Sequence, residues 1–578
     1  MQVKLINPEF KSDFGANLLK FRGIDDVEWY LNPQSPKYLE NPELLCNIEE
    51  GSELFQKKIL DPSNKKILVI VDSDNDGYTS AAIIYLYLKK IAPDKEVDYW
   101  LHQGKQHGLE DHITRLIEEQ EDYSLVIIPD AGSNDYEFMI QTPTLPYLVL
   151  DHHLAEPPYA PNACIINNQL SANYENKDLT GAGVVWQFCR YIDSIKSTNY
   201  SDDLIDLAAW GIIGDMGSLL DYENRYIIYH GLNHIKNFFF KALCDKQAYS
   251  MNNKVNPISV AFYIVPLTNA MIRIGTMEEK TRLFEAYIKG EEKIPSGKRG
   301  AKGTLEFRAV ESARECTNAR THQNKAKDQM VEKLEQKIFK YDLLENKVLF
   351  VRLDDDDNFP PELVGLVAMQ LSAKYKKPTL VGRLNAEGYD RGSIRGLNDS
   401  ALTSLKDYLE STGMFEYVQG HDNAAGFSIR DEYLSDFHKR ANEELKDIDF
   451  GENCFNVNFI VPANNVGLIE DITLDLDKYS QLWGQDNDEP LIYIQNLHIK
   501  QKDIQVIGKN SNTLKIEKDG ITYIKFFATD LIEDLVHTDS DLILNIVGKP
   551  NLNEWMGRYT PQIIIEDCEY RKDSILEF

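Results

Sequence analysis

The stretch ILVIVDSDNDG, residues 67–77, begins with five apolar residues and contains three aspartates, Asp72, Asp74 and Asp76. A continuous apolar run of this length is typical of a strand buried on both faces, and residues 78–91 then show helical periodicity. Polar groups at the end of a buried strand are costly unless something binds them. The stretch therefore predicts a strand–helix unit whose strand ends at a ligand site.

The same alternation of short apolar runs and helical patterns continues along the chain. Apolar runs follow at 97–101, 125–129 and 147–150, and a helical pattern covers 109–121. Strands separated by helices indicate βαβ units and a parallel sheet that is covered on both faces. In such sheets ligands gather at the carboxyl ends of the strands.

Beyond this sheet the sequence predicts further domains, so the expected fold class is a multidomain α/β protein. A mainly helical stretch is expected at 178–345, in which IPSGKRGAKG (294–303) marks a break or the start of a long helix. From about residue 452 short alternating strands predict a small β barrel with almost no helix except near 529–536. The expected divisions are a lead-in at 1–45, a catalytic domain at 46–290, a basic connecting helix at 291–345, a second α/β domain at 346–448 and the barrel at 452–578.

Composition limits the class of protein. The chain has 578 residues, which exceeds the size of a single core. Its seven cysteines are scattered singly without a CxxC pair, which argues against a disulfide framework and against a cysteine zinc site. We find neither a run of about 18 apolar residues nor the pattern of a signal peptide. We therefore expect a soluble, cytoplasmic protein with no membrane partner.

The charge of the chain is uneven. The formal net charge of −30 counts against a nucleic-acid partner, because phosphate binding normally requires a basic surface. Residues 293–327, however, contain nine Lys or Arg and three Glu. This segment is a candidate electrostatic track for nucleic acid, and the alternative is an ordinary solvated helix face.

Acids and imidazoles also follow the other apolar runs. Asp130 follows LVIIP, the triplet Asp151, His152 and His153 follows YLVL, and Asp215 ends the apolar stretch LIDLAAWGIIGD. If the strands are neighbours, these acids share one rim of the sheet and repel one another without a cation. Carboxylates with imidazole and no thiolate suit manganese or magnesium, with iron or zinc as alternatives. Two such ions about 3.5–4 Å apart can activate water for phosphoester hydrolysis.

Simpler explanations exist for each piece. DSDNDG matches the opening of a calcium loop, but the twelfth position counted from Asp72 is Ile83 instead of a glutamate. A single aspartate at a strand end is most often a helix cap or a turn former. Four separate element ends that all carry such residues favour the metal site.

The ordered set DSDNDG, PDAGS, DHH and GIIGDMGSLLD resembles the four motifs of the DHH phosphoesterase superfamily. The details are similar to its RecJ branch, the single-strand-specific 5′→3′ exonucleases. LVGLVAMQLSAKYKKPTLVG, DRGSIRGL and GHDNAAGFSI resemble the associated DHHA1 domain, and LWGQDNDEP and LNEWMGRYTPQIIIED resemble the OB-fold module. The resemblance covers nearly the whole chain from about residue 45.

The resemblance implies roles for individual residues. Two divalent cations, with Mn²⁺ expected before Mg²⁺, are held by a set in which Asp130 is the bridge: Asp74, Asp76, Asp130, His152 and Asp215. His153 faces the scissile phosphate, whereas Asp72 and Asp151 ligate the ions or orient their ligands. The implied catalytic residues are thus His153, Asp130, Asp72 and Asp151.

A second implied set contacts nucleic acid. Arg273, Arg395 and His421 match positions that contact the backbone or the phosphate near the metals, with salt bridges or capping as the alternative. The basic segment adds Lys298, Arg299, Lys302 and Arg308. Aromatic residues of the barrel on which bases could stack are Tyr523, Phe526, Phe527, Trp555 and Tyr559, with core packing as the alternative. On regular strand geometry one of the adjacent pair Phe526 and Phe527 points inward.

The chain also departs from the family pattern. Gln419 stands where a glycine is usual, Ile70 stands where some members have a metal-binding histidine, and the segment before PPELVG (360–365) lacks the usual Trp-His pair. These differences concern substrate contacts and leave the metal cluster intact.

The function that the resemblance implies is a hydrolase, namely a metal-dependent exodeoxyribonuclease that degrades single-stranded DNA from 5′ to 3′ in repair or recombination. The expected partner of the monomer is single-stranded DNA, and a single-strand-binding protein or a helicase are further candidates. One alternative is a DHH–DHHA1 phosphodiesterase for oligoribonucleotides or cyclic dinucleotides. Another is a non-catalytic DNA-binding replication scaffold.

Overall fold

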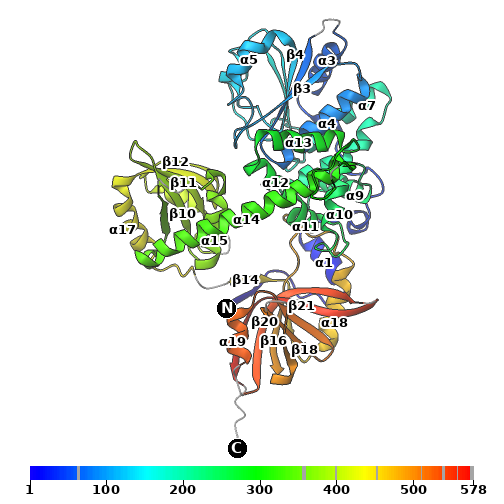
Figure 1. Ribbon diagram of the computed structural model, residues 1–578. Helices are drawn as coiled ribbons and strands as arrows, with labels where there is room; N and C mark the ends of the chain where they lie inside the picture. Colours follow the sequence, from blue (N-terminus) through cyan, green and yellow to red (C-terminus); the bar gives the residue numbers. More distant parts are fainter. Residues whose placement is uncertain are drawn as a thin grey trace, which may run out of the picture. The chain divides into compact units, whose positions relative to one another are not determined.

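The computed structural model describes residues 1–61, 65–301, 303–354, 359–397, 400–450, 454–508, 511–536, 540–555 and 557–572. The chain forms two compact units, which are described separately (Figure 1). The first unit comprises residues 26–324 and 481–488, and the second comprises 1–25, 325–480 and 489–578.

A five-stranded parallel sheet forms the centre of the first unit. Its order is β3 (Val97–Leu101), β2 (Lys66–Val71), β4 (Tyr123–Pro129), β5 (Tyr147–Asp151) and β6 (Ala163–Asn167). All neighbouring pairs are parallel, which confirms the predicted sheet. The sequence analysis did not predict β6. Strands β2, β4 and β5 are adjacent, so their carboxyl ends meet at one edge.

Alternation along β2 places apolar side chains on both faces of this sheet. Leu68 and Ile70 lie in one core, with Leu116 of α5 (Ile113–Glu119). Ile67, Val69 and Val71 lie in the larger core on the opposite face. That core is built by α4 (Asn75–Ile91), α7 (Gly181–Lys196) and the helices that follow. Both faces of β2 are buried, so after Lys66 at the start of the strand the next polar side chain is Asp72.

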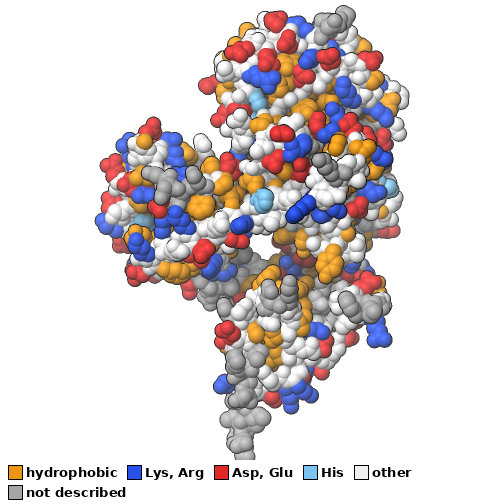
Figure 2. Space-filling model, viewed as in Figure 1, with side chains coloured by type: hydrophobic (Ala, Val, Ile, Leu, Met, Phe, Trp, Pro, Cys, Tyr) orange, Lys and Arg blue, Asp and Glu red, His pale blue; other side chains and the backbone are white. Residues whose placement is uncertain are grey.

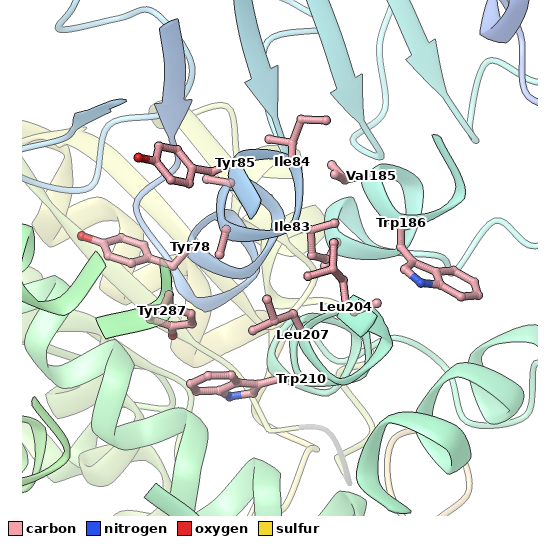
Figure 3. Packing of buried hydrophobic residues seen from close by; sticks show 14 of the residues in the cluster. Tyr78, Ile83, Ile84, Tyr85, Val185, Trp186, Leu204, Leu207, Trp210 and Tyr287 are labelled. Carbon is pink, nitrogen blue, oxygen red and sulfur yellow. The ribbon is translucent and has the colours of Figure 1, made fainter. Parts of the chain in front are cut away.

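Helices complete the first unit as predicted for 178–345. Trp210 of α8 (Ile205–Gly214) stacks on Tyr287, with ring centroids 4.9 Å apart (Figure 3). It also stacks on Phe240, with centroids 4.6 Å apart. Residues 257–274 are long and apolar enough for a membrane span, but 56% of the window is buried, as in a core helix. The other helices and 3₁₀ turns of this unit are α2 (Val27–Leu31), η1 (Pro42–Leu44), α3 (Ile48–Ile59), η2 (Gln120–Asp122), α6 (Tyr136–Met139), η3 (Tyr200–Leu204), α9 (Tyr222–Asn233), α10 (Phe238–Gln247), α11 (Pro257–Ser259), the π-helix η4 (Val260–Ile264), α12 (Val265–Ile274) and α13 (Met277–Lys289).

The glycine- and lysine-rich segment is the tip of a hairpin. Strand β7 (Lys293–Pro295) pairs antiparallel with β8 (Leu305–Phe307), and the long helix α14 (Arg308–Lys340) begins directly after β8. Glycines at 300 and 303 have positive φ angles of 86° and 88°, which turns require. Residues 296–301 and 303–304 therefore lie in the loop between β7 and β8, and Lys302 lies outside the described residues.

The second unit contains the predicted second α/β pattern. Its five-stranded sheet has the order β12 (Phe415–His421), β13 (Ala424–Arg430), β11 (Tyr389–Arg395), β10 (Thr379–Leu384) and β9 (Leu349–Leu353). Only β9 and β10 are parallel among these described strands. The associated helices are η5 (Leu343–Glu345), η6 (Pro361–Leu363), α15 (Val364–Tyr375), α16 (Leu405–Ser411), η7 (Asp431–Tyr433) and α17 (Leu434–Glu444).

The C-terminal strands form one seven-stranded sheet. Its order is β15 (Phe459–Pro462), β16 (Ile492–Ile499), β20 (Leu542–Trp555), β21 (Arg558–Lys572), β19 (Ile521–Lys525), β18 (Thr513–Lys518) and β17 (Ile504–Ile507). The 3₁₀ turn η8 (Gln501–Asp503) and helix α19 (Thr529–Val536) lie between strands.

Two features of this region correct the sequence analysis. Helix α18 (Val466–Asp477) contradicts the expectation of almost no helix outside 529–536, because Ile469, Ile472 and Leu476 recur at helical spacing and are buried. In addition, β1 (Gln2–Leu5) pairs with β14 (Cys454–Val457), and α1 (Phe14–Phe21) belongs to the same unit. The segment 1–45 is therefore divided between the units, and the exact domain boundaries stay predictions.

Candidate metal centre

The acids predicted to share a rim come together at the carboxyl edge of the parallel sheet. Asp72 follows β2, Asp130 follows β4 and Asp151 ends β5, and each side chain is almost completely buried. Asp74 is the N-cap of α4, where its Oδ1 accepts a hydrogen bond of 2.9 Å from the Gly77 amide. The local fold therefore presents aspartates from three adjacent strand ends and one helix start.

Two carboxylate oxygens in this cluster have no hydrogen bond from any described residue although they are buried. They are Oδ2 of Asp76 and Oδ1 of Asp130. The other oxygen of Asp76 accepts bonds from the Thr180 hydroxyl and from the Ala182 amide in the first turn of α7. A buried anionic oxygen without a donor is costly, so these two atoms fit a bound cation.

Glycines allow the acids to pack closely. A Cβ at Gly181 would lie 2.2 Å from Asp130 Oδ1, and a Cβ at Gly211 would lie 2.3 Å from Asp76 Oδ1. Asp130 itself has a φ of 68°, a conformation that aspartate tolerates better than most residues. The motif residues outside the acids are thus small because the carboxylates occupy the space.

His152 connects the strand ends to α8. Its Nε2 lies 3.2 Å from Asp130 Oδ1 and 3.5 Å from Oδ2 of Asp215, which caps the C-terminus of α8. Three triplets in this region have ligand atoms within 4.8 Å of one another: Asp72, Asp74 and Asp130; Asp76, His152 and Asp215; and Asp130, His152 and His153. The structure therefore brings together all five predicted ligands, and their role as ligands stays a prediction.

Burial and the charges of neighbouring acids raise the pKa values of several of these aspartates when no cation is bound. Burial, and after it the charges of Asp76, Asp74 and other neighbouring acids, raises the pKa of Asp130 well above its ordinary value. Burial and the charges of nearby aspartates likewise raise the pKa of Asp74 to about 6 and that of Asp215 to about 8. A bound divalent cation would balance the negative charges of these carboxylates, which would otherwise be neutralised by protonation.

Asp151 differs from the other acids because it orients its neighbours. Its Oδ1 accepts from the amide of His152 at 2.7 Å and from Nδ1 of His153 at 2.8 Å, and its Oδ2 accepts from the Ser133 amide at 3.0 Å. Burial alone would raise the pKa of Asp151, but these bonds and the adjacent imidazoles lower it. The bond to Asp151 raises the pKa of His153 to about 9.

One residue of the site was missed by the sequence analysis. Nδ1 of His107 lies 2.7 Å from Oδ2 of Asp72, and the amide of Gly108 donates to Oδ1 of Asp72 at 3.2 Å. His107 belongs to the loop between β3 and α5. Strand β3 is not followed directly by an acid, so the pattern that revealed the other site residues was missing here. Only the Gly after His107, with a φ of 55°, hinted at a close turn there.

The basic residues predicted for nucleic acid have different environments. Arg273 of α12 is part-buried, which lowers its pKa, and the charge of Asp74 opposes that shift. Lys298 and Arg299 are exposed in the hairpin loop. Arg308 forms ion pairs of 2.6 Å with Glu285 and 3.0 Å with Glu292, as in the salt-bridge alternative, and its contact with nucleic acid stays a prediction.

Ion pairing also weakens the basic segment as a whole. Arg314 pairs with Glu306 and Glu311, so part of the charge counted over 293–327 is neutralised within the segment. On the face drawn in Figure 2, basic and acidic side chains are interspersed. Among the described residues of the segment, the exposed basic side chains are Lys293, Lys298, Arg299 and Lys325.

The remaining predicted contacts belong to the second unit. Arg395 of β11 and His421 of β12 both pair with Ala424 of β13, so they lie on one face of the sheet two strands apart. Tyr559 is 62% exposed on β21, whereas the side chain of Trp555 lies outside the described part of the chain.

The other aromatic predictions are partly wrong. Tyr523 is 1% exposed and is a core residue. Phe526 and Phe527 follow the end of β19 at Lys525, and both are exposed, 50% and 86%. The argument that one of the pair points inward fails because Phe527 has a φ of 53° and is not in a strand.

Comparisons with known proteins agree with the predicted family. The DHH family N-terminal domain matches residues 66–212, and the RecJ OB domain matches residues 468–567. A Bacillus subtilis relative, a candidate SPbeta prophage-derived single-strand DNA-specific exonuclease called YorK, is 37% identical over 98% of both chains. The single-stranded-DNA-specific exonuclease RecJ of Bacillus subtilis is 26% identical over 96% of this chain and 67% of its own length.

Among solved structures, RecJ from Thermus thermophilus in complex with Mn²⁺ has the same fold. The TM-score is 0.73 at 19% sequence identity, and the match covers 98% of this chain and 79% of the other. The motif residues, the two family domains and the near full-length relative agree with one another. The chain belongs to the RecJ-type family of DHH exonucleases.

Proposed function

We propose that this chain is a metal-dependent exonuclease that hydrolyses phosphodiester bonds of single-stranded DNA from 5′ to 3′. The observation that carries the proposal is the cluster of strand-end aspartates with two buried oxygens, on Asp76 and Asp130, that accept no hydrogen bond from any described residue. The family supports the substrate class, because the related proteins carry the name of single-strand-DNA-specific exonucleases.

Asp74, Asp76, Asp130, His152 and Asp215 are the residues that we expect to hold two divalent cations, with Mn²⁺ preferred to Mg²⁺. When bound, such a pair supplies a hydroxide nucleophile and neutralises charge on the phosphate. Asp130 and His152 each belong to two of the three triplets of potential ligands, and we assign the bridging role to Asp130 because a carboxylate offers two oxygens. The neutral imidazole of His152 is favoured by burial, which lowers its pKa and leaves a nitrogen lone pair.

His153 is the residue that we expect to face the scissile phosphate. Its Nδ1 is held by Asp151, and 52% of its side chain is exposed, so the opposite ring nitrogen is available to substrate. A pKa of about 9 keeps this imidazole protonated at neutral pH. It can therefore donate a hydrogen bond to a phosphate oxygen, or a proton to the leaving oxygen.

Other residues are proposed to guide the strand. Lys298 and Arg299 would follow the phosphates without reading sequence, as would Arg273, Arg395 and His421. Phe526, Phe527 and Tyr559 offer exposed rings on which bases could stack, at about 1–3 kcal/mol for each base. We further propose that the enzyme acts as a cytoplasmic monomer in DNA repair or recombination, with a single-strand-binding protein or a helicase as candidate partners.

A digestion of end-blocked strands tests the proposal. With Mn²⁺, a long single strand blocked at its 3′ end should be shortened at the rate of the unblocked strand, and a 5′ block should prevent shortening. Asp130→Asn should abolish the activity while the circular-dichroism spectrum stays unchanged. Cleavage confined to dinucleotides would instead favour the phosphodiesterase alternative, and DNA binding without cleavage would favour the scaffold.

A further inference from the structure

A second group of potential ligands lies in the first unit, apart from the strand-end acids. It comprises His102, directly after β3, together with Asp111 and His112, directly before α5. One ring nitrogen of each histidine and one carboxylate oxygen of Asp111 lie within 4.8 Å of one another. The two imidazole rings are close, with centroids 4.4 Å apart.

Burial makes this arrangement difficult to explain as ordinary packing. His102 is 3% exposed and His112 is 7% exposed, and Nε2 of each ring lacks a hydrogen-bond partner within the described ranges. His102 does use its Nδ1, which is bonded to Asp111 Oδ1. Nε2 of His112 lies 3.7 Å from the same oxygen, which is too far for a hydrogen bond. Two buried imidazoles therefore retain an unsatisfied nitrogen beside one carboxylate.

A transition-metal ion would satisfy these atoms. In a tetrahedral zinc site with bonds of about 2.0 Å, ligand atoms lie about 3.3 Å apart. The 3.7 Å between His112 and Asp111 is therefore close to a ligand separation. Two imidazoles and one carboxylate are typical zinc ligands, and the side chain of Asp111 is 25% exposed, so an ion can enter from solvent.

We propose that His102, Asp111 and His112 bind a zinc-type divalent ion that fastens the two ends of the β3–α5 loop. The loop between these ligands, residues 103–110, carries His107 and Gly108, which contact Asp72. The start of the loop is also held by Lys280 of α13, whose ammonium donates to the carbonyl oxygens of His102 and Gln103. The ion would thus stabilise the loop that supports one acid of the metal centre, without touching that centre.

Zinc content of the full-length protein tests the site. After chelation and reloading with zinc chloride, the wild-type chain should retain one zinc ion more than His102→Gln, His112→Gln and Asp111→Asn. His438→Gln is the matched control, because His438 is a partly buried histidine of the second unit whose buried Nδ1 has no hydrogen-bond partner among the described residues. Asp111→Asn keeps the test valid if a histidine variant fails to fold. Equal zinc content in the wild type and in folded variants overturns the proposal.

Hydrogen exchange provides a readout that is independent of nuclease activity. At a free zinc concentration of about ten times the dissociation constant, amide exchange over 103–110 should slow about tenfold in the wild type and in His438→Gln. The Asp111→Asn variant should show no such slowing. Identical slowing in Asp111→Asn, or no slowing in the wild type, overturns the proposal whatever the nuclease assay shows.

Discussion

Gly181→Ala is the substitution that best distinguishes an effect on the metal centre from an effect on the stability of the fold. A Cβ at Gly181 would lie 2.2 Å from Asp130 Oδ1, whereas real Cβ atoms essentially never approach a heavy atom closer than 3.0 Å. Either the first turn of α7 or the Asp130 carboxylate must therefore move by about 0.8 Å. A misplacement of about 1 Å in a catalytic group costs about 10²-fold in rate.

Gly183→Ala is the matched control on the same helix. Its Cβ would lie 2.2 Å from Cδ1 of Leu179, an equally close approach that involves an apolar side chain. Overpacking costs about 1–3 kcal/mol in both variants. Replacing a glycine inside a helix by alanine stabilises the helix by up to about 1 kcal/mol. Because this gain applies to both variants, their net loss of stability should be similar.

The assay is the initial rate on a 5′-labelled single strand with Mn²⁺, alongside thermal unfolding. We expect both variants to unfold within a few degrees of each other. Gly181→Ala should be about 10²-fold slower than the wild type, and Gly183→Ala should keep most of the activity. Equal loss of activity in the two variants would refute the reasoning that Gly181 makes room for a catalytic carboxylate.

Three further predictions follow from the same contacts. His107→Ala should reduce the rate about 10–100-fold with an unchanged fold, because Asp72 loses its orienting partner; a wild-type rate would remove His107 from the site. Lys298→Glu combined with Arg299→Glu should reduce the slope of log affinity for single strands against log salt by at least about 1.4, whereas Lys57→Glu with Lys58→Glu should leave it unchanged. In the chelated protein, Asp74 and Asp215 hold protons in the folded state that the unfolded chain releases above about pH 4. Stability without metal should therefore fall as pH rises from about 4 to about 8, and thermal unfolding with Mn²⁺ should show a weaker fall; parallel pH profiles would contradict the assignment.

The sequence was sufficient for the parallel sheet and for the acids at its edge. Apolar runs such as 67–71 are unambiguous because both faces of the strand are buried. An aspartate that ends one such run could cap a helix or form a turn, but aspartates that end several runs together favour a metal site. The order of the strands could not be read from the runs themselves, yet adjacency of β2, β4 and β5 is what brings Asp72, Asp130 and Asp151 together.

The residues that the sequence did not reveal depend on tertiary contacts. His107 lies in a polar loop, and its partner Asp72 follows β2, which is distant in the sequence. Asp111 and His112 lie at the start of the predicted helical pattern 109–121, and only the tertiary structure brings them to His102. The ion pairs of Arg308 with Glu285 and Glu292 could not be predicted from the sequence, because they form across 23 and 16 positions of the chain. Helix α18 was missed because its β-branched residues favour a strand locally, whereas its buried face follows helical spacing.

Electron paramagnetic resonance of the manganese-loaded protein tests the central claim most directly. Two Mn²⁺ ions about 3.5–4 Å apart, as in two-metal hydrolases, give a spin-coupled spectrum that isolated ions cannot give. We predict this coupled spectrum for the wild type and only uncoupled Mn²⁺ for Asp130→Asn. Uncoupled manganese in the wild type at saturation, or the same coupled spectrum in Asp130→Asn, would contradict a metal pair bridged by Asp130.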